Sequence, residues 1–316
     1  MKVVYLIQTH KNPEQIYRLV EIIKKSSFGS YILVAHNYNA CNLDVKPLHW
    51  FPEVEVINTK GGRGNFYLVQ GYLDAIGWLL KHNVEFDWLI NITGQDYPTQ
   101  PLPKIEKFLD ETKFDGFLEY FNAVSPLKDN PWGFTEGYER YFYRYWQLGR
   151  ELSRWQRALI KLPRKVINTV QPFVRINTSY GLMVGIRSQT TPFNENFLCY
   201  GGSYFMTLSK KCIQYLHEFV NHNIELKKYY EKTRIPDESF LVSILVNSGI
   251  FNFCHNDNKR YIDWDRTKFG HPRILTAKDY PKLIDDDIHF ARKFDITQDS
   301  KILDLLDMRI FKTKKC

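Results

Sequence analysis

The sequence lacks the cysteine patterns of metal-binding and disulfide-rich proteins. Its five cysteines are widely spaced along 316 residues: Cys41, Cys199, Cys212, Cys254 and Cys316. No two of them form a Cys-x-x-Cys pair, so the pattern predicts neither a zinc site nor a disulfide framework. A reducing compartment is the simplest environment for such a chain, and we therefore expect a cytoplasmic protein.

Long apolar runs are missing as well. No stretch of about 18 consecutive apolar residues exists, so no transmembrane helix is predicted. The apolar run at the N-terminus is too short for a signal peptide, and it is followed too soon by His10 and Lys11. Zinc spacings and ribonucleoprotein-type strands are also absent, which argues against a nucleic-acid partner. The formal net charge of +8 therefore indicates other anions, such as small phosphorylated molecules or a membrane surface.

The composition is that of an ordinary globular protein. Hydrophobic residues make up 44% and charged residues 25% of the chain, which is enough to bury a large core. Aromatic residues reach 16%, a high share. Two interpretations of these aromatic residues stay open, because they can pack inside the core or present their ring faces to sugars.

Strands and helices alternate through about the first 120 residues. The predicted strands are Val3–Ile7, Tyr31–Val34, Val54–Ile57 and Asp87–Ile92. This pattern predicts an α/β fold with a mostly parallel central sheet and flanking helices. Ligands of such sheets bind beyond the carboxyl ends of the strands. The loops expected to share that rim are Thr9–His10, Ala35–His36, Gly61–Gly64 and Gly94–Asp96.

The middle of the chain, 120–200, is less regular, and we predict an insertion within a single domain that spans 1–316. The cations and aromatic residues of Arg140–Trp146 indicate a partly buried amphipathic helix or one wall of a binding site. Further on, the basic segment 150–175 shows cations and apolar residues at helical spacing. Its cations are Arg150, Arg154, Arg157, Lys161, Arg164, Lys165 and Arg175, and its only acid is Glu151. Such a helix can pack on the core or rest on an anionic membrane surface.

Several short motifs occur in a characteristic order. They are His10-Lys11-Asn12, Gly94-Gln95-Asp96-Tyr97-Pro98, Gly202-Ser203-Tyr204-Phe205, Pro236-Asp237-Glu238, Trp264, and Phe290-Ala291-Arg292-Lys293-Phe294-Asp295. Taken alone, acids after a proline indicate no more than a good helix start. In this order, however, the motifs resemble those of the core-2/I-branching β-1,6-N-acetylglucosaminyltransferases and the related peptide O-xylosyltransferases. The resemblance runs nearly from end to end.

The resemblance implies a GT-A-like fold and an inverting sugar transfer that needs no metal ion or other cofactor. Glu238 falls on the catalytic base of the family. Arg273 and Lys293 fall on the cations that replace the metal ion at the donor's diphosphate. The sequence agrees, because the turn after the predicted fourth strand has one acid, Asp96, instead of the Asp-x-Asp motif of metal-dependent enzymes. The late run Asp285–Asp287 indicates a solvated acidic turn.

Other site residues follow from the same resemblance. His36, Arg63 and Asp96 fall on the side of the UDP-sugar donor, and Trp264 and Tyr204 on the side of the acceptor. Arg140 is assigned to the acceptor side through the wall of cations and aromatic residues in Arg140–Trp146. At two donor-side positions the chain departs from the family, since His36 replaces the usual acid and Arg63 stands near the glycine turn.

The predicted function is transfer of N-acetylglucosamine or xylose from a UDP-sugar to a hydroxyl of a glycan, in bacterial polysaccharide biosynthesis. A lipid-linked glycan at the inner membrane face would suit peripheral binding through the basic segment 150–175. Two alternatives stay open. The donor can be another UDP-sugar, such as UDP-glucuronate or UDP-galactose, or the chain can be a non-catalytic carbohydrate- or lipid-binding protein.

Overall fold

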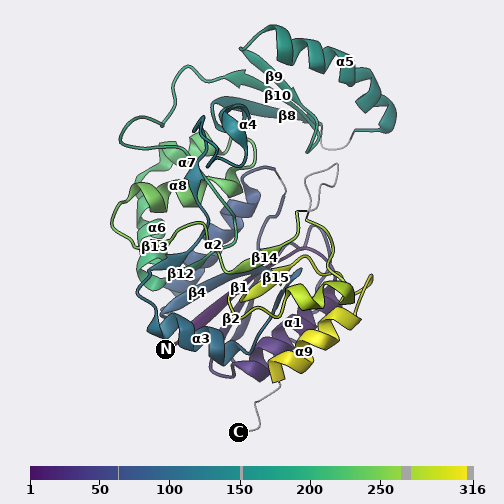
Figure 1. Cartoon of the computed structure of the whole chain (residues 1–316), viewed down its shortest axis with the longest axis vertical. Helices are drawn as coiled ribbons and strands as arrows, with labels where there is room; N and C mark the ends of the chain where they lie inside the picture. The colour runs from purple at the N-terminus through teal and green to yellow at the C-terminus, as the bar shows by residue number, and fades with distance from the viewer. Residues whose placement is uncertain (63, 150–151, 265–271, 312–316) are drawn as a thin grey trace.

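The computed structural model describes the chain except for residues 63, 150–151, 265–271 and 312–316 (Figure 1). A seven-stranded sheet forms its centre, with the strand order β13-β6-β12-β4-β1-β2-β3. The strands are β1 (Val3–Thr9), β2 (Tyr31–His36), β3 (Val54–Asn58), β4 (Trp88–Thr93), β6 (Gly116–Phe117), β12 (Thr207–Ser209) and β13 (Phe253–Cys254). β12 pairs antiparallel with β4 and β6, and the other pairings are parallel. The predicted α/β class with a mostly parallel central sheet is confirmed.

Helices cover both faces of this sheet. They are α1 (Pro13–Ser26), α2 (Tyr67–Lys81), α3 (Leu102–Glu111), α6 (Lys210–His222), α7 (Ile224–Tyr230), α8 (Phe240–Asn247) and α9 (Lys301–Phe311). Alternate side chains of β1 point to opposite faces of the sheet. Val4 and Leu6 join the core under α2, α6 and α8, whereas Tyr5 and Ile7 join the core under α1, α3 and α9. Every residue of β1 is buried, as a central parallel strand requires.

In a small three-stranded sheet, the C-terminal part of the chain pairs with the segment that follows β4. The order of this sheet is β14-β15-β5, formed by β14 (Arg260–Ile262), β15 (Phe290–Arg292) and β5 (Asp96–Pro98). β15 runs antiparallel to β5, and this register places Arg292 opposite Asp96. A separate two-stranded antiparallel ribbon is formed by β7 (Phe121–Asn122) and β11 (Tyr200–Gly201).

The segment Arg140–Trp146 is not the helix that the sequence favoured. Helix α4 (Gly133–Tyr141) ends within it, and strand β8 (Tyr143–Gly149) begins. Tyr143 and Tyr145 are buried, whereas Arg144 is half-buried and Trp146 exposed. This alternation has a period of two residues, which fits a strand with one covered face better than a helix.

Strand β8 belongs to a second antiparallel sheet, β8-β10-β9, with β9 (Val174–Asn177) and β10 (Leu182–Arg187). The predicted basic helix is present as α5 (Arg154–Val170), capped by Ser153 and Gln156, which bond each other's backbone N–H groups. The small sheet and α5 lie at one end of the molecule, away from the central sheet (Figure 1). Among the described residues, no helix combines the length and the apolar character needed to cross a membrane.

His289 makes folding sensitive to acid. Its ring is buried against Phe108, with ring centres 4.9 Å apart, and burial together with Arg260 and Lys259 lowers its pKa from 6.5 to about 3. Between these values the unfolded chain binds a proton that the native protein does not, so stability falls as the pH drops below 6.5. In chemical denaturation between pH 7 and pH 4, replacing this residue (His289→Phe) is expected to reduce the slope of the unfolding free energy by up to about 1.4 kcal/mol per pH unit. An unchanged slope contradicts the assignment.

Candidate active site

Three of the sequence motifs meet at the carboxyl end of the central sheet. The loop after β1 contacts the C-terminal motif, because Asn12 donates a hydrogen bond of 3.2 Å to Asp295 and Lys11 forms an ion pair of 3.5 Å with the same carboxylate. The backbone N–H of Phe294 donates to the carbonyl of Gln95, in the turn after β4, at 2.8 Å. Two of the four loops predicted to share a rim, those after β1 and β4, therefore meet here together with the C-terminal motif.

Cations dominate this rim. Asp96 is almost fully buried, and its Oδ1 lies 3.2 Å from Nε of Arg292. Burial lowers the pKa of Arg260 to about 10, a shift that Asp96 opposes and Arg292 reinforces. Partial burial and the cations Lys11, Lys293 and Arg292 likewise lower the pKa of His10. Buried Asp96 thus lies among several positive groups, and such a rim suits an anionic ligand.

The predicted base, Glu238, ends the short helix η1 (Pro236–Glu238) that precedes α8. Its Oε2 accepts a hydrogen bond of 2.6 Å from Nη1 of Arg140. Its side chain is 26% exposed, and Oε1 makes no hydrogen bond to the residues that the structure describes. One carboxylate oxygen is therefore held in place while the other can accept a proton from a bound molecule.

Arg140 is itself held from several sides. Its Nε lies 2.7 Å from Oε1 of Glu136, and the guanidinium lies 4.1 Å from the ring centre of Trp132. Arg234 binds the same Glu136 oxygen at 2.6 Å. Burial alone would lower the pKa of Arg140, but the carboxylates of Glu238 and Glu136 raise it above its ordinary value. Arg140 therefore stays charged and fixes the orientation of Glu238.

Residues 202–205 connect the carboxylate to the cations. The N–H of Gly202 donates to the carbonyl of Glu238 at 2.9 Å, and the ring centre of Phe205 lies 3.8 Å from the guanidinium carbon of Arg292. A Cβ atom on Gly202 would lie only 2.0 Å from the carbonyl oxygen of Glu119, so the chain needs glycine here. The motif around Gly202 thus joins the two halves of the site.

Sequence reasoning missed three residues of this region. Phe205 and Arg292 occur in the motifs, but neither was predicted to be a site residue. Glu119 belongs to none of the motifs. Burial, with the nearby charges of Asp257 and Glu238, raises the pKa of Glu119. Its proximity to Glu238 arises from tertiary contacts, and no spacing in the sequence could have revealed it.

Arg273 lies among acids. Its guanidinium contacts Asp279 at 2.7 and 2.9 Å and Asp263 at 2.6 Å, and these contacts raise its pKa while that of Asp279 is lowered. Asp279 belongs to the short helix η2 (Ala277–Lys282). Two carboxylates already compensate the charge of Arg273, so its contact with a diphosphate stays a prediction. Lys293 is half-buried in the rim beside Arg292.

Two other predicted site residues are enclosed. His36 is fully buried, with Nδ1 2.7 Å from the Thr9 hydroxyl and Nε2 2.8 Å from the Cys41 carbonyl. Tyr204 is buried too, and its hydroxyl bonds the side chain of Gln8. Both side chains are packed inside the protein, and their direct contact with donor or acceptor stays a prediction.

The remaining predicted residues differ in their setting. Trp264 follows β14 and is 54% exposed, so its ring face is open to a ligand. Arg63 lies outside the described residues.

The run Asp285–Asp287 forms an exposed turn whose Asp286 pairs with Lys104 at 2.7 Å, as a solvated acidic turn would. Among the residues that the structure describes, no three or more His, Cys, Asp or Glu side chains are grouped to hold a metal ion.

Fold and site together define an α/β protein with a cationic rim at the carboxyl end of its sheet. Residues 202–205 connect this rim to Glu238, whose carboxylate is held by Arg140. Comparison with known families agrees with the motifs, since residues 143–284 match the model of the Core-2/I-Branching enzyme family. The resemblance predicted from the sequence is confirmed over these residues, and Glu238 and Arg273 lie within the matched segment.

Curated relatives are distant. The chain is 25% identical over 255 residues to the Beta-glucuronosyltransferase GlcAT14B of Arabidopsis thaliana, a match that covers 77% of this chain and 48% of the relative. It is 22% identical over 343 residues to Xylosyltransferase 2 of Canis lupus familiaris, covering 98% of this chain and 34% of the relative. The chain therefore spans half or less of the length of these relatives.

Among solved structures, S. aureus TarS 1–349 is similar at 12% identity, covering 99% of this chain and 66% of that one, with a TM-score of 0.40. A second structure of TarS 1–349, in complex with UDP-GlcNAc, has a TM-score of 0.28 at 18% identity and covers 38% of this chain and 34% of that one. Scores this low support no argument about function.

The pairing of Arg273 with two acids predicts a structural penalty for its removal. Replacing it (Arg273→Ala) removes the guanidinium that contacts the largely buried carboxylates of Asp279 and Asp263, and we expect a loss of roughly 1–3 kcal/mol in unfolding free energy. Chemical denaturation measures this loss, with the exposed Lys278→Ala as the control. Equal stability of the two variants would show that the ion pairs contribute nothing.

Proposed function

We propose that the chain is an inverting glycosyltransferase that moves a sugar from a UDP-sugar to a hydroxyl group of a glycan. The observation on which this proposal rests is Glu238, held by Arg140 at 2.6 Å in a chain that matches the Core-2/I-Branching enzyme family over residues 143–284. The cationic rim around Asp96 and Arg292 supports an anionic donor. The meeting of the separate motifs at one edge of the sheet supports a common site.

In the proposed reaction Oε1 of Glu238, which bonds none of the described residues, accepts the proton of the acceptor hydroxyl. The resulting oxygen nucleophile forms a bond to the anomeric carbon of the donor sugar. The bond from that carbon to the diphosphate breaks on the opposite side, and UDP leaves with the electron pair. Arg140 touches neither sugar in this scheme, and its task is to keep the carboxylate in one orientation.

Negative charge develops on the departing diphosphate, and preorganised cations stabilise it. Lys293 is the proposed contact, with Arg273 as the second cation that the family resemblance implies. Arg292 and Arg260 add to the positive field from the strands behind them. We propose on this basis that no metal ion takes part. The single acid of the turn after β4, Asp96, supports the proposal because it is already paired with Arg292.

UDP-N-acetylglucosamine and UDP-xylose are the proposed donors. UDP-glucuronate is a second candidate, which the similarity to a glucuronosyltransferase favours. The proposed acceptor is a glycan in bacterial polysaccharide assembly, and a lipid-linked glycan at the cytoplasmic face of the membrane fits best. Trp264 can stack its open ring face on an acceptor sugar.

Release of UDP tests the function directly. We expect turnover with one of these donors and a simple glycan acceptor. The variant Glu238→Gln keeps the shape of the side chain but cannot accept the proton, so transfer is expected to fall by roughly 10²–10⁴-fold while UDP still binds. The control is Glu231→Gln, an exposed acid of the same region.

Two results would count against this assignment. Near-normal transfer by Glu238→Gln would move the base elsewhere. Binding of a UDP-sugar or a glycan without any UDP release, across the whole panel, would favour the non-catalytic alternative.

Removal of divalent ions tests the second part of the proposal. Turnover is expected to survive exhaustive treatment with EDTA, because protein cations take the place of a metal ion at the diphosphate. Initial rates before and after treatment, with manganese or magnesium added back, provide the measurement. A loss of more than about tenfold that either ion restores would contradict it.

A further inference from the structure

Helix α5 exposes its apolar side. Trp155, Leu159, Leu162, Val166 and Val170 are separated by three or four residues and therefore lie along one side of the helix. Their exposed fractions are 82%, 74%, 71%, 52% and 76%. The sequence left open whether this side packs on the core. The structure decides against packing, because no residue of α5 is buried.

The opposite side of α5 attaches it to the small sheet through polar contacts. The side chain of Asn168 pairs with the backbone of Ile176 in β9, donating at 3.0 Å and accepting at 2.8 Å. Arg164 donates a hydrogen bond to the hydroxyl of Thr178. A typical surface helix turns its apolar side inward. In α5 the half-buried residues are Ile160, Arg164, Ile167 and Asn168, a mixture of apolar and polar side chains, whereas the apolar side from Trp155 to Val170 stays exposed.

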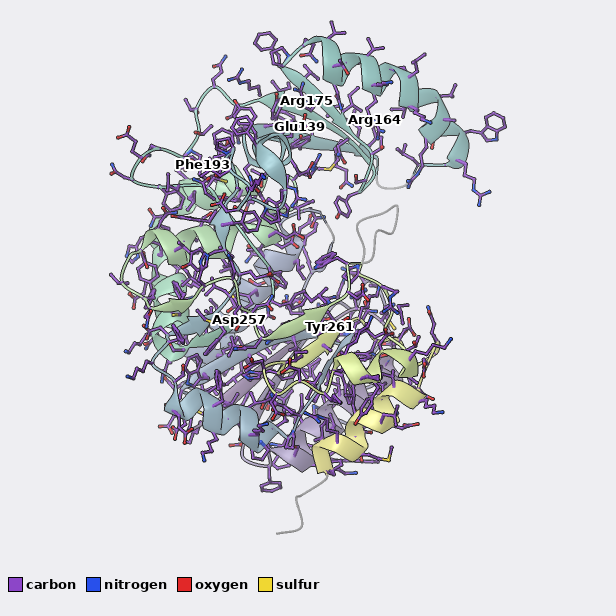
Figure 2. All side chains as sticks on the ribbon, viewed as in Figure 1. Glu139, Arg164, Arg175, Phe193, Asp257 and Tyr261 are labelled. Atoms are coloured by element: carbon purple, nitrogen blue, oxygen red, sulfur yellow. The ribbon has the colours of Figure 1, made fainter. Side chains whose placement is uncertain are left out.

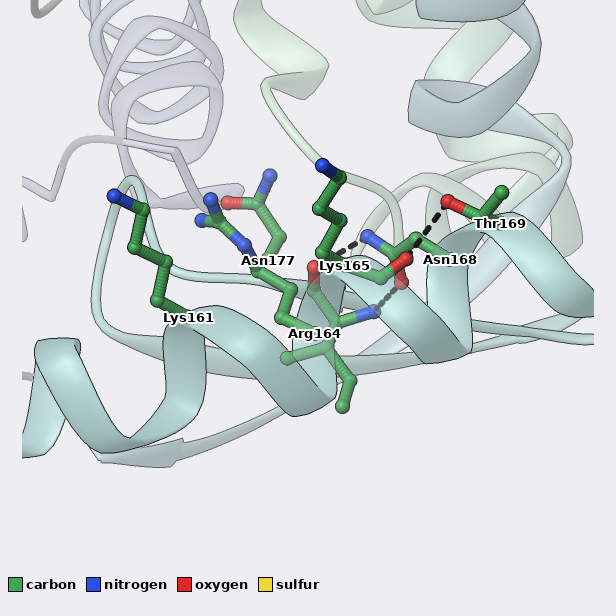
Figure 3. A pocket seen from close by; sticks show the side chains of 7 residues that line it. Lys161, Arg164, Lys165, Asn168, Thr169 and Asn177 are labelled. Carbon is green, nitrogen blue, oxygen red and sulfur yellow. Dashed lines mark hydrogen bonds between the residues drawn. The ribbon is translucent and has the colours of Figure 1, made fainter.

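Cations border the exposed apolar side. Arg154, Lys161 and Lys165 follow one flank of the helix, and no acidic residue occurs from Arg154 to Arg175. Lys161, Arg164 and Lys165 also line a shallow pocket of about 310 Å³ beside β9, and all three extend to the same side of the helix (Figure 3). A partner of this surface must therefore combine apolar groups with negative charge.

We propose that α5 docks this protein on a lipid bilayer that contains anionic lipids. The apolar side from Trp155 to Val170 enters the boundary between headgroups and acyl chains, and the flanking lysines bind lipid phosphates. A second copy of the chain fits less well, because a symmetric contact through this helix would bring like charges together. The docking does not depend on the proposed reaction, so it can be tested without any activity measurement.

Sedimentation with vesicles tests the proposal on the full chain. The protein is expected to pellet with vesicles of phosphatidylcholine mixed with phosphatidylglycerol at low salt. Much less should pellet with phosphatidylcholine alone or at high salt, because salt screens exposed charges. Hydrogen exchange of the backbone N–H groups in 154–170 should slow on addition of the mixed vesicles.

Two pairs of matched variants locate the docking surface. The apolar variant combines Trp155→Ser with Leu162→Ser, and its control combines Trp50→Ser with Leu127→Ser, which are exposed to a similar degree, at 82% and 67%. The charge variant combines Lys161→Glu with Lys165→Glu, and its control changes the exposed Lys113 and Lys128 to Glu. We expect each α5 variant to bind at least about tenfold more weakly, while each control binds as the wild type does.

Three outcomes would overturn the proposal. The first is that the wild type remains in the supernatant with anionic vesicles at low salt. The controls can lose as much binding as the α5 variants, which would leave only a general attraction of the net positive charge. Finally, sedimentation equilibrium can reveal a dimer that Trp155→Ser dissociates, without vesicle binding, and α5 would then be an interface between copies of the chain.

Discussion

The antiparallel pairing of β15 with β5 is the constraint on which the candidate site depends. It places Arg292 opposite Asp96, and the resulting ion pair of 3.2 Å closes the rim at the end of β4. Because the pairing partners are almost 200 residues apart in sequence, the C-terminal motif would otherwise have no fixed relation to the parallel strands. The contacts of Asp295 with Asn12 and Lys11 then follow from the same return of the chain. Polar and charged contacts of two buried acids, Asp96 and Asp295, thus connect three separate segments.

Glu238 is positioned by a different principle. Its own helix contributes only the backbone, and the side chain is oriented by Arg140, which lies 98 residues earlier. Arg140 can do this because Glu136 and Trp132 hold its guanidinium from the other sides. A carboxylate with one oxygen occupied and one oxygen open loses little conformational freedom when it receives a proton. Such preorganisation lowers the entropic cost of reaching the transition state, compared with a base that moves freely in solvent.

The sequence predicted the parts of the molecule that local pattern controls. The strands β1 to β4 follow from apolar runs between turn residues, and α5 follows from cations and apolar residues at helical spacing. The helix favoured over Arg140–Trp146 was wrong, because the aromatic residues and cations of this segment suit a helix or a strand equally well. Only the burial of Tyr143 and Tyr145 in β8 distinguishes the two. The partners of Glu238 and Arg273 could not be predicted. Ion pairs across long sequence separations depend on the tertiary fold, and exposed acids such as Asp285 look the same in sequence as Asp263 and Asp279.

The docking surface and the carboxylate are joined by one continuous series of contacts. Asn168 of α5 binds β9 through Ile176, and the neighbouring Arg175 forms an ion pair of 2.7 Å with Glu139 of α4 (Figure 2). Glu139 precedes Arg140, which holds Glu238. These contacts run through the small sheet and α4, and they link α5 to the base. If α5 rests on a bilayer, this linkage sets where Glu238 lies relative to the lipid surface, which would restrict the acceptors that reach it to those presented at that distance.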